Sequence, residues 1–152
     1  MKRLEVITGS EGDTGEPKLN ALVTFYNAFN NRNRALMKSS WANDTGVVMS
    51  NPLGGVKRGW GEISEVYERI FSGQTKVFVE FYEFTLRGSD EMFVAVGRER
   101  GFVRTPDQTI ELKIRTSRVF QRVDGEWKQI HHHGSIDDSH LLELYQEAVI
   151  KK

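Results

Sequence analysis

The chain has 152 residues, and its 21 basic and 21 acidic side chains give a formal net charge of zero at pH 7. Binders of nucleic acid or anionic membranes carry an excess of positive charge, so neither kind of partner is expected. The absence of cysteine excludes disulfides and thiolate zinc sites, and it fits a cytoplasmic location. The length predicts one domain, and no motif calls for a metal or a cofactor, so neither is expected.

The N-terminal segment is weakly patterned. Its stretch TGSEGDTGEP, residues 8–17, contains almost no apolar side chain, which is typical of a mobile segment. We therefore expect residues 1–16 to form a flexible tail and residues 17–152 to form a single domain. Leu4, Val6 and Ile7 could add a short edge strand to that domain.

The first half of the domain shows the spacing of amphipathic helices. In residues 18–31 apolar side chains recur every three or four positions, which predicts a helix with one buried stripe. Further helices are expected over residues 34–42 and 60–71. A turn at Asn51-Pro52 and Gly54-Gly55 separates two short strands, residues 47–49 and 56–58.

From residue 75 onward the apolar period changes to two, which predicts β-strands. Long strands are expected over residues 76–87, 91–104, 109–123 and 126–136, with turn signals between them. A last helix over residues 137–150 has Asp137 or Asp138 as its N-cap. Helices followed by a strand meander indicate an α+β fold.

The expected strands exceed the usual ~5–6 residues, so the sheet must twist and curl around the helices. Apolar side chains occupy both faces of the first long strand. Phe78, Tyr82 and Phe84 oppose Val77, Val79 and Phe81. One face covers the helices and the other needs a partner, so we expect a homodimer that forms through the outer face of the sheet.

The most specific segment is RVFQRVDGEWKQIHHHGS, residues 118–135, in which Asp124-Gly125 marks a hairpin turn. With FVAVGRER, residues 93–100, it resembles the nuclear transport factor 2-like superfamily. Within that superfamily it is similar to SnoaL-like proteins and to the association domain of calcium/calmodulin-dependent protein kinase II. The resemblance spans roughly residues 18–136. It implies a cone, in which a strongly curved, mostly antiparallel sheet wraps around N-terminal helices.

The resemblance also implies a pocket on the inner face of the sheet. Two arginines of the family pocket fall on Arg98 and Arg118, and a third falls on Gly134, which has no side chain. Strand parity then turns His132 and Ile130 inward. The same parity turns three residues outward: Trp127, His131 and His133.

Ketosteroid isomerases share this superfamily, but the chain lacks their catalytic residues. Their general base, an aspartate before a proline, falls on Asn51, and an amide cannot take a proton at neutral pH. Their oxyanion tyrosine falls on Phe25, with Tyr26 adjacent, and their protonated aspartate falls near Arg118 or Val119. Isomerase chemistry of that type is therefore not expected.

Simpler interpretations exist for the two arginines and for His132. Arg98 and Arg118 either bind an anion in the pocket or, as ordinary strand residues, face solvent or pair with Glu80 or Glu111. His132 is an inward acid/base or hydrogen-bonding group, or a core histidine.

The remaining candidates also have two interpretations each. Trp41 and Trp60 either cap the mouth of the pocket or pack in the core. Asn51 contacts a ligand or bonds its own backbone in the turn. His131 and His133 have a spacing that suits a metal, but no third ligand is evident, so an interface is favoured.

These observations favour the binding of a small, partly apolar, anionic molecule in the cone, with Arg98 and Arg118 as anchors. His132, Tyr26 and Asn51 would add polar contacts. One alternative is a SnoaL-like cyclase, isomerase or hydrolase with His132 as acid/base. Another is an oligomerisation module like the kinase hub.

Overall fold

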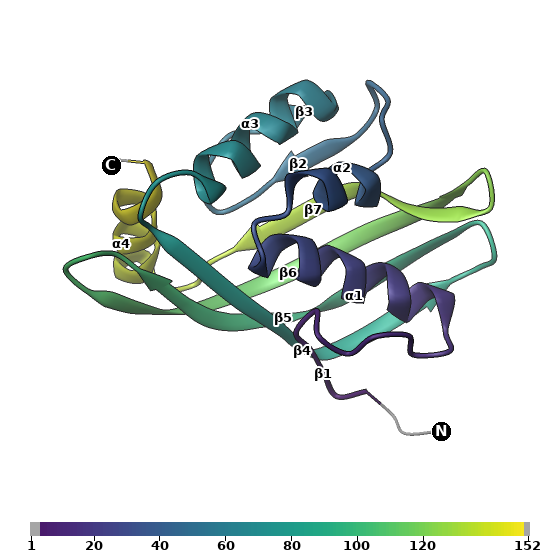
Figure 1. Cartoon of the computed structure of the whole chain (residues 1–152), viewed down its shortest axis with the longest axis horizontal. Helices are drawn as coiled ribbons and strands as arrows, with labels where there is room; N and C mark the ends of the chain where they lie inside the picture. The colour runs from purple at the N-terminus through teal and green to yellow at the C-terminus, as the bar shows by residue number, and fades with distance from the viewer. Residues whose placement is uncertain (1–3, 151–152) are drawn as a thin grey trace.

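The computed structural model describes residues 4–150 and shows a mixed α+β fold (Figure 1). The helices are α1 (Pro17–Asn30), α2 (Arg34–Ser40), α3 (Gly59–Phe71) and α4 (Ser139–Ile150). The strands are β1 (Val6–Ile7), β2 (Val48–Ser50), β3 (Lys57–Arg58), β4 (Lys76–Gly88), β5 (Met92–Arg104), β6 (Thr109–Val123) and β7 (Glu126–Ser135). The helices and long strands expected from the sequence are therefore confirmed, with closely similar bounds.

The described strands form one seven-stranded sheet in the order β1-β4-β5-β6-β7-β2-β3. Neighbouring strands are antiparallel except β2 and β7, which run parallel. Helices α1, α2 and α3 lie over one face of the sheet, and α4 packs at its end beside β6 and α3 (Figure 1). This arrangement confirms the expected cone, a curved and mostly antiparallel sheet around N-terminal helices.

Strand β6 shows how the sequence separates the two faces of the sheet. Alternate side chains along β6 are buried under the helices, and most of those between them are exposed. The buried set is Ile110, Leu112, Ile114, Thr116, Arg118 and Phe120. The inward positions of β6 are thus apolar up to Ile114 and then include Thr116 and Arg118. These two polar side chains enter the cone interior because they have the same strand parity as the apolar ones.

A β-bulge changes the parity of β7. The register between β6 and β7 shifts at Val119/Phe120, and Gln129 becomes fully buried. The expectation that Trp127 points outward is wrong, because its ring packs edge-on against the buried Phe93 at a centroid distance of 5.0 Å. The alternation of inward and outward side chains, counted back along β7 from the histidines, is therefore not valid beyond the bulge.

Part of the N-terminal segment is bound to the domain. Strand β1 pairs with β4 as an edge strand, with Ile7 opposite Phe81. The amide of Asn30 on α1 donates to the Thr8 carbonyl at 2.9 Å. The edge strand considered from the sequence is therefore present. The division into a flexible tail and a domain stays a prediction, and residues 1–3 lie outside the described residues.

Helix α4 covers the end of the cone. The Asp138 side chain accepts hydrogen bonds from the N–H groups of His140 and Leu141, so the second N-cap candidate is the one used. Tyr145 and Val149 turn from this helix into the core and are buried. Across residues 4–150, no helix has the length and apolar character needed to cross a membrane.

Candidate functional site

An ion pair lies at the centre of the cone. Arg118 on β6 and Glu99 on β5 are joined by a contact of 3.1 Å between Nη2 and Oε2, and their side chains are only 4% and 5% exposed. A single buried charge is costly, so each residue depends on the other. Glu99 is the residue that the sequence analysis missed at this site.

Further hydrogen bonds complete a polar cluster around Glu99. The Tyr26 hydroxyl of α1 donates to Oε2 at 2.6 Å, and the Thr116 hydroxyl donates to Oε1 at 2.8 Å. Arg118 donates through Nη1 to the side-chain amide oxygen Oε1 of Gln129 at 2.8 Å, and its guanidinium lies 3.6 Å from the centre of the Phe25 ring. The cluster therefore ties α1, β5, β6 and β7 together.

Burial and the pair set the charge state of this cluster. Burial raises the pKa of Tyr26, and the neighbouring Glu99 raises it further, so the phenol keeps its proton. Burial acts against the charge of Arg118, but Tyr26 and Glu99 outweigh it and raise the pKa of the guanidinium. The cluster holds one positive and one negative charge at neutral pH.

A small enclosed cavity of about 40 Å³ adjoins the ion pair. Its lining is mixed: polar groups from Asn51, Tyr67, Glu99, Arg118, His132 and Tyr145, and apolar ones including Phe25, Met49 and Ile114. A space of this size holds a water molecule or two, and its polar wall suits them. Tyr145 of α4 is therefore part of the wall that keeps the cavity small.

His132 lines this cavity and is 5% exposed. Burial lowers its pKa well below 6.5, and the charge of Arg118 lowers it further. Its Nδ1 lies 3.3 Å from the Ser117 carbonyl oxygen, which assigns the proton to Nδ1 and leaves Nε2 as a hydrogen-bond acceptor. The expected inward orientation is present, and the side chain is neutral at pH 7.

The structure does not bring Arg98 and Arg118 together. Arg98 lies on the outer face of β5, is 55% exposed, and pairs with Glu83 at 2.9 Å. The expectation that it enters the cone is wrong, and the solvent-facing alternative is the one observed. Residues 93–96 are apolar on both faces, so the sequence does not show which parity points inward, and Glu99 occupies the inner position instead.

The aromatic candidates lie in the core rather than at the cavity. Trp41 is 1% exposed, and its indole N–H donates to the Tyr67 hydroxyl at 3.3 Å. Trp60 packs near the same ring, 6.4 Å between centroids. Neither tryptophan nor Tyr26 belongs to the cavity wall. The roles in ligand binding expected for these three residues stay predictions, and none of their side chains lines the cavity.

Asn51 and Gly134 occupy the positions expected from the family. Asn51 lines the cavity, and its side-chain oxygen Oδ1 accepts the Leu53 N–H at 3.1 Å, so the turn interpretation is observed and the ligand contact stays a prediction. Gly134 is inward, and a Cβ there would lie 3.2 Å from the His132 ring and from Pro52. A third arginine therefore has no room at this position.

The other histidines do not form a metal site. His131 Nδ1 lies 2.9 Å from the Val48 carbonyl oxygen, within the parallel β2–β7 pairing. His133 is exposed on the outer face. Within residues 4–150, no three His, Cys, Asp or Glu side chains are grouped so that they could hold a metal ion.

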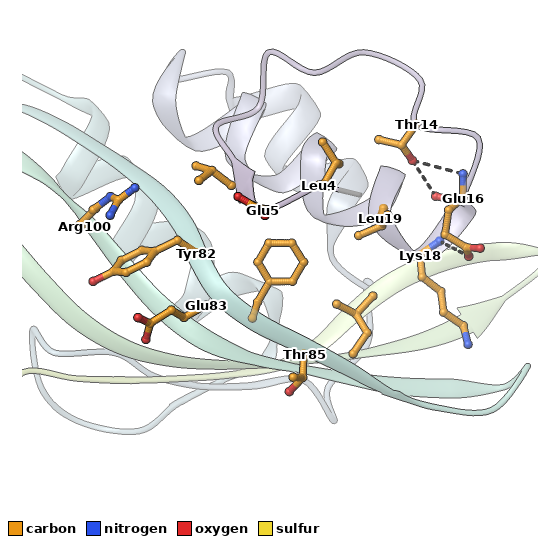
Figure 2. A pocket seen from close by; sticks show the side chains of 13 residues that line it. Leu4, Glu5, Thr14, Glu16, Lys18, Leu19, Tyr82, Glu83, Thr85 and Arg100 are labelled. Carbon is orange, nitrogen blue, oxygen red and sulfur yellow. Dashed lines mark hydrogen bonds between the residues drawn. The ribbon is translucent and has the colours of Figure 1, made fainter. Parts of the chain in front are cut away.

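A larger hollow lies outside the cone. A groove of about 1100 Å³ runs between the N-terminal segment, the start of α1 and β4, with Leu4 and Leu19 on one side and Tyr82 and Thr85 on the other (Figure 2). It is open to solvent, and it contains none of the buried polar cluster. Because size alone does not supply chemistry, we place the candidate site in the cone.

Sequence comparison identifies one family. The profile of the SnoaL-like domain matches residues 19–139. No curated protein matches the chain.

Solved structures share the fold at low sequence identity. A proposed dehydratase of the nuclear transport factor 2-like family from Streptomyces avermitilis is 20% identical, with a TM-score of 0.71 over 82% of this chain and 97% of that chain. A proposed calcium/calmodulin-dependent protein kinase II association domain from Xanthomonas campestris is 17% identical, with a TM-score of 0.71 over 91% and 99%. A proposed ketosteroid isomerase from Shewanella frigidimarina is 18% identical, with a TM-score of 0.64 over 79% and 95%.

Removing the charge of Glu99 should destabilise the fold strongly. Glu99→Gln leaves the Arg118 charge buried and unpaired, and we expect a loss of about 3–5 kcal/mol in the free energy of unfolding. Tyr26→Phe removes a hydroxyl that donates to Glu99 and accepts from Arg118, and it should cost about 1–3 kcal/mol. Urea unfolding measures both.

The exposed Arg98–Glu83 pair supplies the matched control for this prediction. Glu83→Gln breaks the same kind of pair in solvent and should leave the stability nearly unchanged. Equal losses in the free energy of unfolding in Glu99→Gln and Glu83→Gln would contradict the prediction that the buried pair stabilises the fold more than the exposed pair does.

The burial of His132 predicts that the protein loses stability in mild acid. In the unfolded chain this histidine binds a proton near pH 6.5, whereas in the fold its pKa is much lower. The unfolded state therefore binds more protons below pH 6.5, and stability falls there by up to about 1.4 kcal/mol per pH unit. Urea unfolding between about pH 7 and pH 5 should show a steeper slope in the wild type than in His132→Gln.

The exposed His133 is the control for the acid sensitivity. His133→Gln removes a histidine from the same strand and should keep the slope of the wild type. An unchanged slope in His132→Gln would contradict the assignment of a buried, neutral histidine.

Proposed function

Since the chain belongs to the SnoaL-like domain family, we propose that its cone binds a small molecule beside the Arg118–Glu99 pair. The observation that carries this proposal is the cavity itself, where a neutral His132, Asn51 and Tyr145 meet an apolar wall. Most ligand sites combine an apolar lining with a few fixed polar groups in this way. The family contains many activities on one fold, so the proposal rests on these residues and not on the fold.

The charges in the cone favour an uncharged ligand. Arg118 and Glu99 cancel, and no other charged side chain among the described residues lines the cavity. An anion that binds Arg118 would have to displace Glu99 and leave its carboxylate buried without a partner. We therefore revise the expected anionic ligand to a small neutral molecule, whose donor group faces the free Nε2 of His132.

The ligand enters when α4 moves. A ligand pocket usually has a volume of ~300–1000 Å³, far more than the cavity of about 40 Å³ in this structure. The polar contacts that hold α4 over the cone include a hydrogen bond from Gln146 to the Pro52 carbonyl at 3.1 Å and one from the Thr75 hydroxyl to the Ala148 carbonyl at 3.4 Å. Before the helix, Asp137 forms an exposed ion pair with Arg115 at 2.8 Å. The Tyr145 ring occupies the space that the ligand takes when the helix swings away.

The geometry supports binding better than acid/base catalysis. A general base works best with a pKa near the working pH, and burial lowers the pKa of His132 well below that range. Asn51 stands where ketosteroid isomerases have their base, and Phe25 stands where they have a tyrosine. A SnoaL-like cyclase, isomerase or hydrolase reaction would need His132 to regain basicity when the ligand binds.

Enlarging the cavity should reveal the binding site. Tyr145→Ala removes a ring from the cavity wall, and we expect it to bind benzyl alcohol about tenfold more tightly than the wild type. Benzoate has a similar shape but carries a charge, and its binding should not improve. Titrations followed by amide chemical shifts give both affinities and locate the site.

Leu144→Ala is the control, since it shortens an adjacent side chain of α4 that does not line the cavity. Stronger binding of benzoate than of benzyl alcohol would reject the uncharged ligand. Chemical-shift changes confined to the outer groove would reject the cone as the site.

We also propose that two copies associate through the outer face of the sheet. Met92 and Val96 are large apolar residues on this face, and they are 42% and 47% exposed. Phe78 and Phe102 form a stacked pair on the same face, 5.5 Å between centroids. Apolar and aromatic side chains of this kind are typical of the centre of an interface, and one structural neighbour is described as an association domain.

A charge in the apolar patch should prevent the dimer. We expect light scattering to give a dimer for the wild type and a monomer for Val96→Glu, because the introduced carboxylate would be buried in the interface. Val56→Glu changes a valine that is 53% exposed on the loop before β3, and it should leave the dimer intact. A monomeric wild type, or a dimeric Val96→Glu, would exclude this face as the interface.

A further inference from the structure

The outer face of the sheet places two arginines directly opposite each other. Arg98 on β5 and Arg115 on β6 are register partners, and both side chains point away from the helices. Like charges at directly opposed positions destabilise a strand pair. Two guanidinium groups therefore meet at one point on the surface of a protein whose formal net charge is zero.

Each arginine has one carboxylate partner, on the side away from the other arginine. Arg98 pairs through Nε with Glu83 at 2.9 Å, and Arg115 pairs through Nη2 with Asp137 at 2.8 Å. The side chains are 55% and 60% exposed. Their remaining guanidinium nitrogens donate to no other residue among those described, so both retain free donors for a ligand.

A hollow of about 430 Å³ lies beside this pair. It is lined by both arginines and by Ser117, His133 and Ser135. Ser135 lies opposite Arg115, and His133 lies opposite Ser117, so all of these side chains belong to adjacent positions on one face. Their hydroxyl and ring groups form no hydrogen bond with another side chain or backbone group of residues 4–150.

A second groove continues from the same arginines toward α4. Its volume is about 620 Å³, and its wall includes the apolar side chains of Ile114, Leu141 and Leu144. A ligand held by the arginines can therefore extend along this groove with an organic portion. The cone cavity shares neither arginine with this surface.

We propose that Arg98 and Arg115 form a binding site for a phosphate-type oxyanion on the outer face of the sheet. Two guanidinium forks can each bind a pair of oxygens, and the serine hydroxyls and His133 supply further donors around a tetrahedral anion. The anion bridges the opposed arginines through their free donors, and it is either inorganic phosphate or the phosphate of a small molecule whose organic part follows the second groove. This site is separate from the cone.

Titration with inorganic phosphate at constant ionic strength tests the site. The wild type should bind phosphate saturably, with a dissociation constant on the order of 1 mM, and the amide signals of Gly97 and Ser117 should shift. Arg98→Ala and Arg115→Ala should each weaken binding by about tenfold or more. Glu83→Gln should strengthen phosphate binding, because the Glu83 carboxylate that competes for Arg98 is removed.

Phenyl phosphate, a phosphorylated aromatic compound, distinguishes the two kinds of anion. It should bind more tightly than phosphate if the second groove accepts an organic group, and equally tightly if the ligand is free phosphate.

Arg104→Ala is the matched control. Arg104 is an outer-face arginine of β5 whose guanidinium lies 4.6 Å from the Phe102 ring centre, and it does not line the hollow. Equal weakening in Arg104→Ala, or no saturable binding at constant ionic strength, would overturn the proposal. Mass measurements with and without phosphate, on the wild type and on Met92→Glu, complete the test, since Met92 is an exposed residue of the same face that does not line the hollow. A ligand that dissociates a dimer must bind the monomer more tightly, so loss of the dimer on adding phosphate would support a site on the outer face. Absence of saturable binding to both proteins would overturn the proposal.

Discussion

Arg118 and Glu99 face each other inside the cone, where a lone charge of either sign would cost several kcal/mol. Their mutual dependence constrains much of the surrounding structure. Glu99 must be the inward residue of its part of β5, Tyr26 must reach it from α1, and Gln129 must accept from Arg118 across the bulge of β7. A shift of one residue in any of these strands would leave a buried charge without its partner.

The same pair also determines what the cone can bind. An unpaired arginine would make the cavity an anion site, but the paired one presents a neutral surface beside His132 and Asn51. Two further arginines, Arg98 and Arg115, stand opposed on the outer face, each beside one carboxylate. Two neighbouring residues, Arg98 and Glu99, therefore serve opposite faces of the sheet.

Helix α4 links the fold to the size of the site. Its Tyr145 closes a space that is otherwise bounded by the sheet, α1 and α3, and leaves room for little more than water. The helix is anchored by the burial of Tyr145 and Val149 and by hydrogen bonds to Pro52 and Thr75. A site closed by this helix can keep its ion pair out of bulk solvent and still admit a ligand when the helix moves.

The sequence by itself determined the elements and the fold class, because the alternation along the long strands is regular and the hairpin turn at Asp124-Gly125 is explicit. The family resemblance added the inward position of Arg118, an amide at Asn51 in place of an aspartate, and Gly134 in place of an arginine. Only the tertiary structure decided between Arg98 and Glu99, since β5 is apolar on both faces and its parity depends on its neighbours. The bulge in β7 and the closure by α4 likewise arise from contacts between segments distant in sequence, and local periodicity does not record such contacts.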